Sequence, residues 1–134
     1  MSTAIFVNLP VKDLGKSIEF FTSLGYSFNP QFTDDKAGCL VISDTIYVML
    51  LTEPFFSTFT TKSLADRGTS TTAILALSQD SKEDVDRLAD AAVAAGAQTA
   101  KEPADASPMY TRSFYDLDGH HWEIFHMDPA AVQQ

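Results

Sequence analysis

The chain of 134 residues contains one cysteine, Cys39, and only 9 basic residues against 18 acidic ones. A single cysteine excludes an intrachain disulfide and a multi-cysteine zinc site. The formal net charge of -9 argues against nucleic acid and anionic membranes as partners, because both attract clustered Lys and Arg. The expected partner is therefore a small neutral or cationic molecule, or another protein.

Long hydrophobic runs are also missing. No apolar stretch approaches the ~20 residues needed to cross a bilayer, and no basic segment followed by an apolar run stands at the N-terminus. There is no Gly-rich phosphate loop and no nucleophile elbow. What is present is 45% hydrophobic residues, enough for a continuous core in one domain of this size. These features predict a soluble, cytoplasmic protein.

Hydrophobic periodicity predicts the same order of elements twice. In the first half, a strand at 4–11 is followed by a helix between Asp13, a plausible N-cap, and Gly25, a left-handed stop. In the second half, Ser81 begins a helix with Asp84 three residues on, as in a capping box, and Gly96 ends it. The remaining predicted segments are strands at 26–33, 37–42, 45–51, 71–78, 98–102, 110–115 and 121–126, with a loop at 103–108.

The duplication predicts an α+β fold of two βαβββ modules, in which curved mixed sheets enclose a central cavity and the helices lie outside. The expected apolar stripe of the second helix consists of Val85, Leu88, Ala89 and Val93. We expect a single domain with module 1 at about 1–52, a connector at about 53–69, module 2 at about 70–127 and a short tail. The cavity is the expected ligand site.

The densest polar stretch is Tyr110 to Glu123, YTRSFYDLDGHHWE, in a probable hairpin. Strand alternation places His121, Glu123 and Phe125 on one face and His120, Trp122, Ile124 and His126 on the other. Glu123 and His121 are the catalytic candidates. His120 is expected at a solvated hairpin corner and His126 at the surface or in a dimer contact, whereas Trp122 and Ile124 are expected under the second helix.

Two segments, FVNLPVKDLGKSIEFFTSLGY and RSFYDLDGHHWEIFHMDPAA, resemble the vicinal oxygen chelate superfamily of glyoxalase I, bleomycin-resistance proteins and extradiol dioxygenases. The chain is similar in particular to bacterial proteins labelled predicted lactoylglutathione lyases. The resemblance implies four metal-ligand positions, which fall at Phe6, Met49, Ile74 and Glu123. Only Glu123 is a credible ligand, because the other three side chains do not bind hard or borderline cations. A divalent metal is therefore possible only through a rebuilt site, for which Glu123 and His121, with Asn8 as an added oxygen, are the candidates.

The resemblance implies two alternative functions. One is a glyoxalase-like lyase or isomerase in which Glu123 acts as general base on a small organic molecule. The other is a metal-free protein of the bleomycin-resistance type that sequesters a small molecule in a cavity lined by Phe6, Tyr47, Met49 and Phe125. Ile74 and Asn8 are further candidates for ligand contacts.

Two features remain open at this point. Tyr110 and Arg112 share a face of one strand, so they either line the cavity, where Arg112 would bind a carboxylate or counter Glu123, or lie at the surface. The connector aromatics Phe55, Phe56 and Phe59 form either a lid or a contact with a second subunit. From the resemblance and these aromatics we expect a homodimer.

Overall fold

The computed structural model describes residues 3–106 and 108–128. Its internal contacts divide the chain into two compact units, Met1–Ala65 and Asp66–Gln134. The boundary lies within the segment expected to be a connector. Each unit contains one mixed sheet with a helix packed on one of its faces, and each is described by itself.

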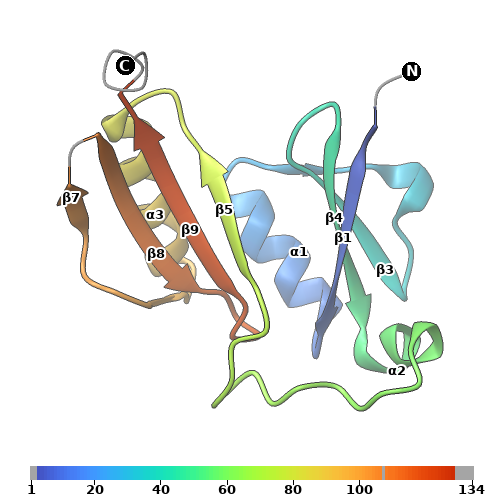
Figure 1. Cartoon of the computed structure of the whole chain (residues 1–134). Coiled ribbons are helices and arrows are strands. Elements are labelled where there is room, and N and C mark those ends of the chain that lie inside the picture. Colours follow the sequence, from blue (N-terminus) through green and yellow to red (C-terminus); the bar gives the residue numbers. More distant parts are fainter. Residues whose placement is uncertain (1–2, 107, 129–134) are drawn as a thin grey trace. The chain divides into compact units, whose positions relative to one another are not determined.

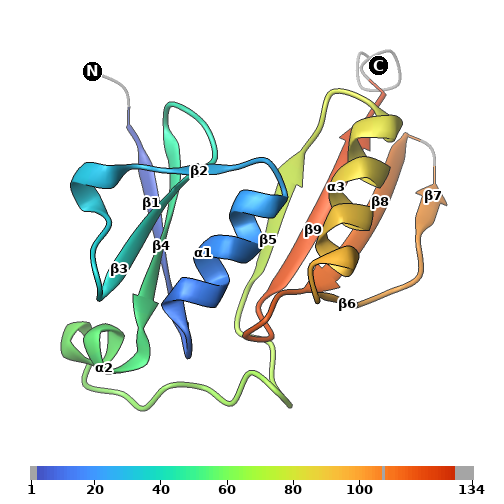
Figure 2. The same ribbon diagram turned by 180° about the vertical axis from the view of Figure 1, so that it is seen from behind.

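Unit 1 contains a four-stranded sheet in the order β1-β4-β3-β2, in which β1 and β4 are parallel and the other neighbours antiparallel. Figures 1 and 2 show α1 on one face of this sheet. Its elements are β1 (Ile5–Val11), α1 (Leu14–Ser23), β2 (Ser27–Phe28), η1 (Pro30–Phe32), β3 (Ala37–Val41), β4 (Ile46–Thr52), α2 (Glu53–Phe56) and η2 (Ser57–Phe59).

The ends of α1 follow from two residues. The Asp13 side chain accepts a hydrogen bond from the backbone N of Lys16, 3.1 Å away, and so satisfies one of the donors left free at a helix start. Gly25 has φ of 102°, a conformation that glycine adopts without strain. Both predicted helix signals are confirmed. Between them, Phe20 and Phe21 are buried, and α1 contacts β4, in which Val48 and Leu50 are also buried.

Unit 2 repeats this arrangement with the sheet order β5-β9-β8-β6, and β7 pairs with the outer side of β8. The strands β5 and β9 are parallel, and β8 is antiparallel to β9. Its elements are β5 (Ile74–Ser78), α3 (Lys82–Ala94), β6 (Gln98–Thr99), β7 (Ala104–Ala106), β8 (Met109–Tyr115) and β9 (His121–Met127). The two units confirm the predicted α+β fold with repeated modules.

The helix α3 differs from its prediction at one position. Its N-cap is confirmed, because Ser81 Oγ accepts a hydrogen bond from the backbone N of Asp84 at 3.1 Å. Val93, however, is 44% exposed, whereas Ala92 is fully buried. Ala92 lies seven residues after Val85, two turns along the same face, whereas Val93 is rotated one residue further toward solvent.

Several strands also differ from their predictions, among them the strand predicted at 71–78, which begins at Ile74. The predicted strands at 26–33 and 98–102 contract to the two residues of β2 and β6, and Pro30 begins the 3₁₀ turn η1 instead. The predicted loop at 103–108 contains β7, which pairs with β8 through Ala104 and Thr111. An outer strand of this kind tolerates the neighbouring Pro103, because only one of its edges must be hydrogen-bonded.

Within the described residues, no helix is both long enough and apolar enough to cross a membrane.

Candidate functional site

Strand register in unit 2 places the catalytic candidates in two adjacent rows. Glu123 lies between Ala76 of β5 and Ser113 of β8. His121 lies between Ile74 and Tyr115 in the same way. Directly paired residues project from the same face of a sheet, with Cβ atoms about 4.5–5.5 Å apart. We call the face that carries these two rows the open face.

The opposite face of the sheet packs against α3, as Figure 2 shows. Its central residues Phe114, Trp122 and Ile124 are 1% exposed or less. The expectation that Trp122 and Ile124 lie under the second helix is confirmed. Alternation along β9 then places His121, Glu123 and Phe125 on the open face.

Tyr110 and Arg112 lie on the helix face. Arg112 is paired with Ile124, and its Nη1 donates hydrogen bonds to Asp86 Oδ1 at 3.1 Å and Asp90 Oδ1 at 2.8 Å. The Tyr110 hydroxyl donates to Asp86 Oδ1 at 2.5 Å. Arg112 therefore does not counter Glu123. Instead, Tyr110 and Arg112 fasten β8 to α3.

This cluster shifts the pKa values of its members. The hydrogen bond from Tyr110, with a smaller contribution from the hydrogen bond and the charge of Arg112, holds the pKa of Asp86 below its usual value despite partial desolvation. The same bond raises the pKa of Tyr110. For Arg112, burial acts to lower the pKa, but the hydrogen bonds to Asp90 and Asp86 outweigh it and the pKa rises. At neutral pH, these pKa shifts favour the ionised forms of Asp86 and Arg112 and the protonated, hydrogen-bonded form of Tyr110.

The turn that leads into β9 is organised by Asp116, which is 8% exposed. Its Oδ1 accepts hydrogen bonds from the backbone N of Asp118 at 2.9 Å and of His120 at 3.0 Å, and its Oδ2 accepts one from Trp122 Nε1 at 2.9 Å. Burial raises the pKa of this carboxyl, although the nearby His120 and the three donors act in the opposite direction. Asp116 thus sets where β9 begins and orients its first residues.

The position expected for His120 was wrong. The residue is 7% exposed rather than solvated, because its backbone is hydrogen-bonded to Asp116 and the turn is covered by the segment around Arg67. Arg67 Nε donates to the backbone O of Asp118 at 3.0 Å, and its guanidinium lies 3.8 Å from the Asp118 carboxylate. Sequence reasoning included Asp116 and Asp118 in the polar stretch but did not assign either a role. The spacing of Asp116, Asp118 and Gly119 is the local signal for such a turn.

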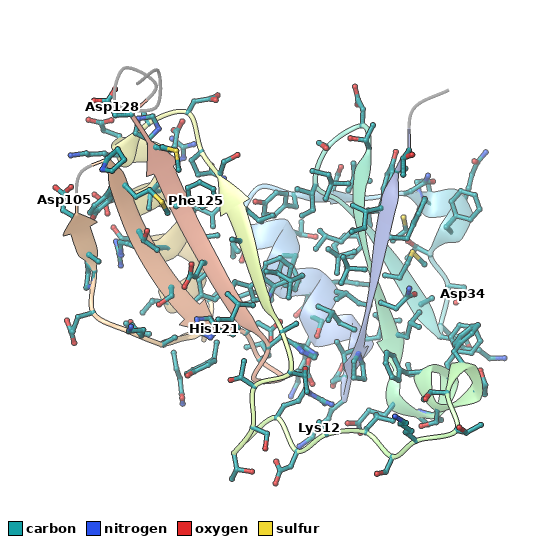
Figure 3. The ribbon with its side chains drawn as sticks, viewed as in Figure 1. Lys12, Asp34, Asp105, His121, Phe125 and Asp128 are labelled. Atoms are coloured by element: carbon teal, nitrogen blue, oxygen red, sulfur yellow. The ribbon has the colours of Figure 1, made fainter. Side chains whose placement is uncertain are left out.

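His121 presents an unsatisfied polar atom. The residue is 7% exposed, and its Nε2 is buried without a hydrogen-bond partner among the described residues. Its ring contacts that of Tyr115 edge to face, with centroids 5.3 Å apart. Glu123, two residues along β9, is partly buried, and no hydrogen bond or ion pair reaches its carboxylate within the described part of the chain. Figure 3 labels His121, the first residue of this strand, and Phe125, which lies further along it.

Buried polar groups usually have partners, so an unsatisfied imidazole nitrogen beside a free carboxylate is an arrangement suited to a ligand. His126, by contrast, is occupied: its Nδ1 lies 3.0 Å from the backbone O of Gln79, and the residue is partly buried.

The equivalent face of unit 1 is apolar. Phe6 pairs with Tyr47 and Asn8 with Met49 in the register of β1 and β4. The Phe6 and Tyr47 rings are stacked, with centroids 4.7 Å apart and planes 11° from parallel, and Phe6 is 52% exposed. Asn8 Nδ2 donates to the backbone O of Phe6 at 3.2 Å. Met49 and Glu123 thus occupy matching positions in the central strands of the two sheets.

The residues present do not fit the divalent metal that the family's ligand positions would hold. Three of the four ligand positions that the resemblance implies fall at Phe6, Met49 and Ile74, whose side chains offer no oxygen or nitrogen. Across residues 3–106 and 108–128, no group of three or more His, Cys, Asp or Glu side chains is arranged to hold an ion. We therefore derive no chemical step through a metal.

The fold just described has repeated modules in matching register and a carboxylate at the centre of β9. The sequence of the chain also matches a known family. Residues 4–124 match the family model described as Glyoxalase/Bleomycin resistance protein/Dioxygenase superfamily. The chain belongs to this superfamily.

Solved structures of this superfamily's fold resemble the chain over nearly its whole length. A hypothetical protein from S. aureus is 30% identical with a TM-score of 0.79, and the match covers 94% of this chain and 95% of that one. A family enzyme from Burkholderia phytofirmans PsJN is 19% identical with a TM-score of 0.78, over 95% and 100% of the two chains. The fosfomycin resistance protein FosX from Listeria monocytogenes is 19% identical with a TM-score of 0.69, over 98% of each chain. A search of curated proteins found no match.

Proposed function

We propose that this superfamily member is a glyoxalase-like isomerase or lyase that acts on a small organic molecule at the open face of unit 2, with Glu123 as general base. The observation that carries the proposal concerns two groups that have no partner among the described residues: the buried Nε2 of His121 and, two residues along β9, the carboxylate of Glu123. A general base must lie within hydrogen-bond reach of the proton that it removes, and a free carboxylate on an open sheet face can be approached in this way.

The proton transfer would need no other reactant. Glu123 takes a proton from a hydroxyl-bearing carbon next to a carbonyl, which leaves an enediolate, and returns it to the former carbonyl carbon. The proton of the substrate's hydroxyl passes to the former carbonyl oxygen, so that the substrate is isomerised without gain or loss of atoms. Because Nε2 of His121 is buried in this structure, the side chain must turn before this atom can hydrogen-bond to the substrate oxygen on which negative charge develops. Ser113, which is paired with Glu123, helps to shape the face, and its Oγ accepts a hydrogen bond from the backbone N of Lys101 at 3.1 Å.

The test uses the hemithioacetal of methylglyoxal and glutathione, the substrate implied by the lactoylglutathione lyase label. We expect conversion to the thioester in the presence of a chelator, and Glu123→Gln to lower the rate by about 10²-fold or more. Glu19→Gln, an exposed glutamate on α1, is the matched control and should retain the rate. Equal rates for the two variants, or no conversion by the wild type, would refute the isomerase proposal.

A second function is favoured by the stacked pair Phe6 and Tyr47 in unit 1. An exposed aromatic platform beside Met49 suits an apolar ligand, as in a protein that sequesters a molecule without transforming it. The neutral dye N-phenyl-1-naphthylamine is a suitable probe. We expect binding that increases its fluorescence and that Phe6→Ala weakens, whereas Phe32→Ala, which alters a similarly exposed ring outside the platform, leaves it unchanged. Equal effects of the two variants would count against this function.

A further inference from the structure

A pocket of about 410 Å³ lies at one end of the unit 2 sheet, and all of its lining residues belong to that unit. Three segments meet there: residues 67–71 before β5, residues 96–98 after α3, and residues 115–119 between β8 and β9. The volume falls within the range of about 300–1,000 Å³ that is usual for small-molecule sites. Neither Glu123 nor Phe125 lines it.

The wall formed by residues 67–71 is held in place by specific contacts. The side chains of Arg67 and Asp118 are 9% and 5% exposed, and Arg67 donates to the Asp118 backbone as well. Gly119 allows the two segments to approach closely, because a Cβ at this position would lie 2.7 Å from the backbone O of Arg67. The following residues are held by a turn in which the backbone N of Ser70 donates to the backbone O of Asp66 at 2.9 Å. The backbone of this wall is therefore held against the turn at Gly119.

The lining offers hydrogen bonds without presenting a charge. Within the described chain, the side chains of Thr71, Gln98 and Tyr115 have no hydrogen-bond partner, so a hydroxyl, an amide and a phenol are available to a ligand. The charge of Arg67 is matched by Asp118, and the Asp116 carboxylate is buried under its own three donors. A chain with a net charge of -9 also disfavours anionic ligands.

Two apolar surfaces accompany these polar groups. The ring of Tyr115 contributes an aromatic wall, and Leu117, which is 43% exposed, contributes an aliphatic one. A molecule with hydroxyls at its edges and C–H groups on its faces matches both kinds of surface.

We propose that this pocket is a binding site for a neutral, hydroxylated small molecule of about the size of a hexose. The site shares Tyr115 with the row that contains His121, but its occupation does not require Glu123 or the isomerase proposal. Loss of ligand binding in this pocket therefore cannot be mistaken for loss of isomerase activity.

The probe is methyl α-D-glucopyranoside, added at up to about 50 mM because single-site affinities for such ligands are often in the millimolar range. In amide NMR spectra of the whole chain, we expect saturable shifts confined to residues 67–71, 96–98 and 115–119. Thr71→Val should weaken binding about threefold to tenfold, the loss of one hydrogen bond. Thr72→Val, the same substitution at an exposed neighbour that does not line the pocket, should have no effect, and Glu123→Gln should also bind normally.

Glucose 6-phosphate separates a neutral site from an anion site. The proposal requires that it bind no more tightly than the methyl glucoside. Tighter binding of the phosphate, shifts outside these three segments, no saturable shift, or equal weakening by Thr71→Val and Thr72→Val would each overturn the proposal.

Discussion

Asp116 is the residue on which the turn before β9 depends, because three donors converge on its carboxylate. In Asp116→Asn, the amide group cannot accept a hydrogen bond through its nitrogen, so Trp122 Nε1 is left buried without a partner. We expect a loss of about 1–3 kcal/mol in the free energy of unfolding, measured by urea denaturation. The loss should be smaller when Trp122 is already replaced by Phe; an unchanged loss in that background would show that the indole contact is not the cause.

A second prediction at this scale concerns Gly119, which has φ of 83°. Gly119→Ala forces an alanine into the left-handed region of φ and also brings its Cβ into a clash with the backbone of Arg67. Gly25→Ala has the conformational cost alone, because no atom lies within 4 Å of the new Cβ. We expect thermal or urea unfolding to show that Gly119→Ala loses about 1–3 kcal/mol more than Gly25→Ala. Equal losses would mean that the segment at Arg67 is not held against the turn.

At the scale of elements, Tyr110 and Arg112 fasten β8 to α3 through Asp86 and Asp90. The pKa of Asp86 is lower in the folded chain than in the unfolded one, so the unfolded state binds more protons just below the ordinary carboxyl pKa of 3.8. This contribution is complete above that value and is lost as the pH falls through the lowered, folded pKa.

Tyr110→Phe removes the principal cause of this shift. We expect the stability difference between wild type and variant to be largest above about pH 4 and to shrink as the solution is acidified further. Because the Asp86 side chain is 46% exposed, solvent screening should keep its ionic part below about 1 kcal/mol. The free energy of unfolding of the wild type and of Tyr110→Phe should be measured from pH 5 to about pH 2, with Tyr115→Phe as the control. A difference that grows on acidification would have the wrong sign for this account.

Local signals predicted most of these elements. Asp13, Ser81 and the two glycines after the helices act within a few residues of their own positions, and alternation along β9 correctly separated Glu123 from Trp122. Such local signals could not predict contacts between residues that are far apart in the chain. The burial of His120 depends on a segment more than fifty positions earlier in the chain, and the side occupied by Arg112 depends on which face α3 covers. The unsatisfied nitrogen of His121 likewise follows from packing.

At the scale of the whole molecule, the aromatic residues of α2 and η2, of which Phe59 is exposed and Phe55 and Phe56 are partly buried, bear on assembly. Phe59 is 68% exposed and lies edge to face with Phe55, with centroids 5.1 Å apart. Exposed aromatic clusters often mark interfaces, and we propose that this one contributes to a homodimer. Light scattering at micromolar concentration should show a dimer, and Phe59→Ser should weaken it. Phe32→Ser, the control, removes a ring that is 60% exposed and should leave the dimer unchanged. A monomeric wild type would rule out the homodimer.

The two modules of this superfamily member carry different residues at the matching position of their central strands, Glu123 in β9 and Met49 in β4. With Phe6 and Ile74 at the remaining ligand positions, we propose that this carboxylate acts as a base and not as part of a metal site.

The divalent metal content of the purified protein tests this claim most directly. Elemental mass spectrometry of wild type and Glu123→Gln, after incubation with Zn²⁺, Mn²⁺ or Ni²⁺ and removal of excess ion, should give far less than one ion per chain for both proteins. One tightly bound ion per chain in the wild type that is lost in Glu123→Gln would contradict the account, because Glu123 would then be a ligand in a metal site that this donor set was not expected to form.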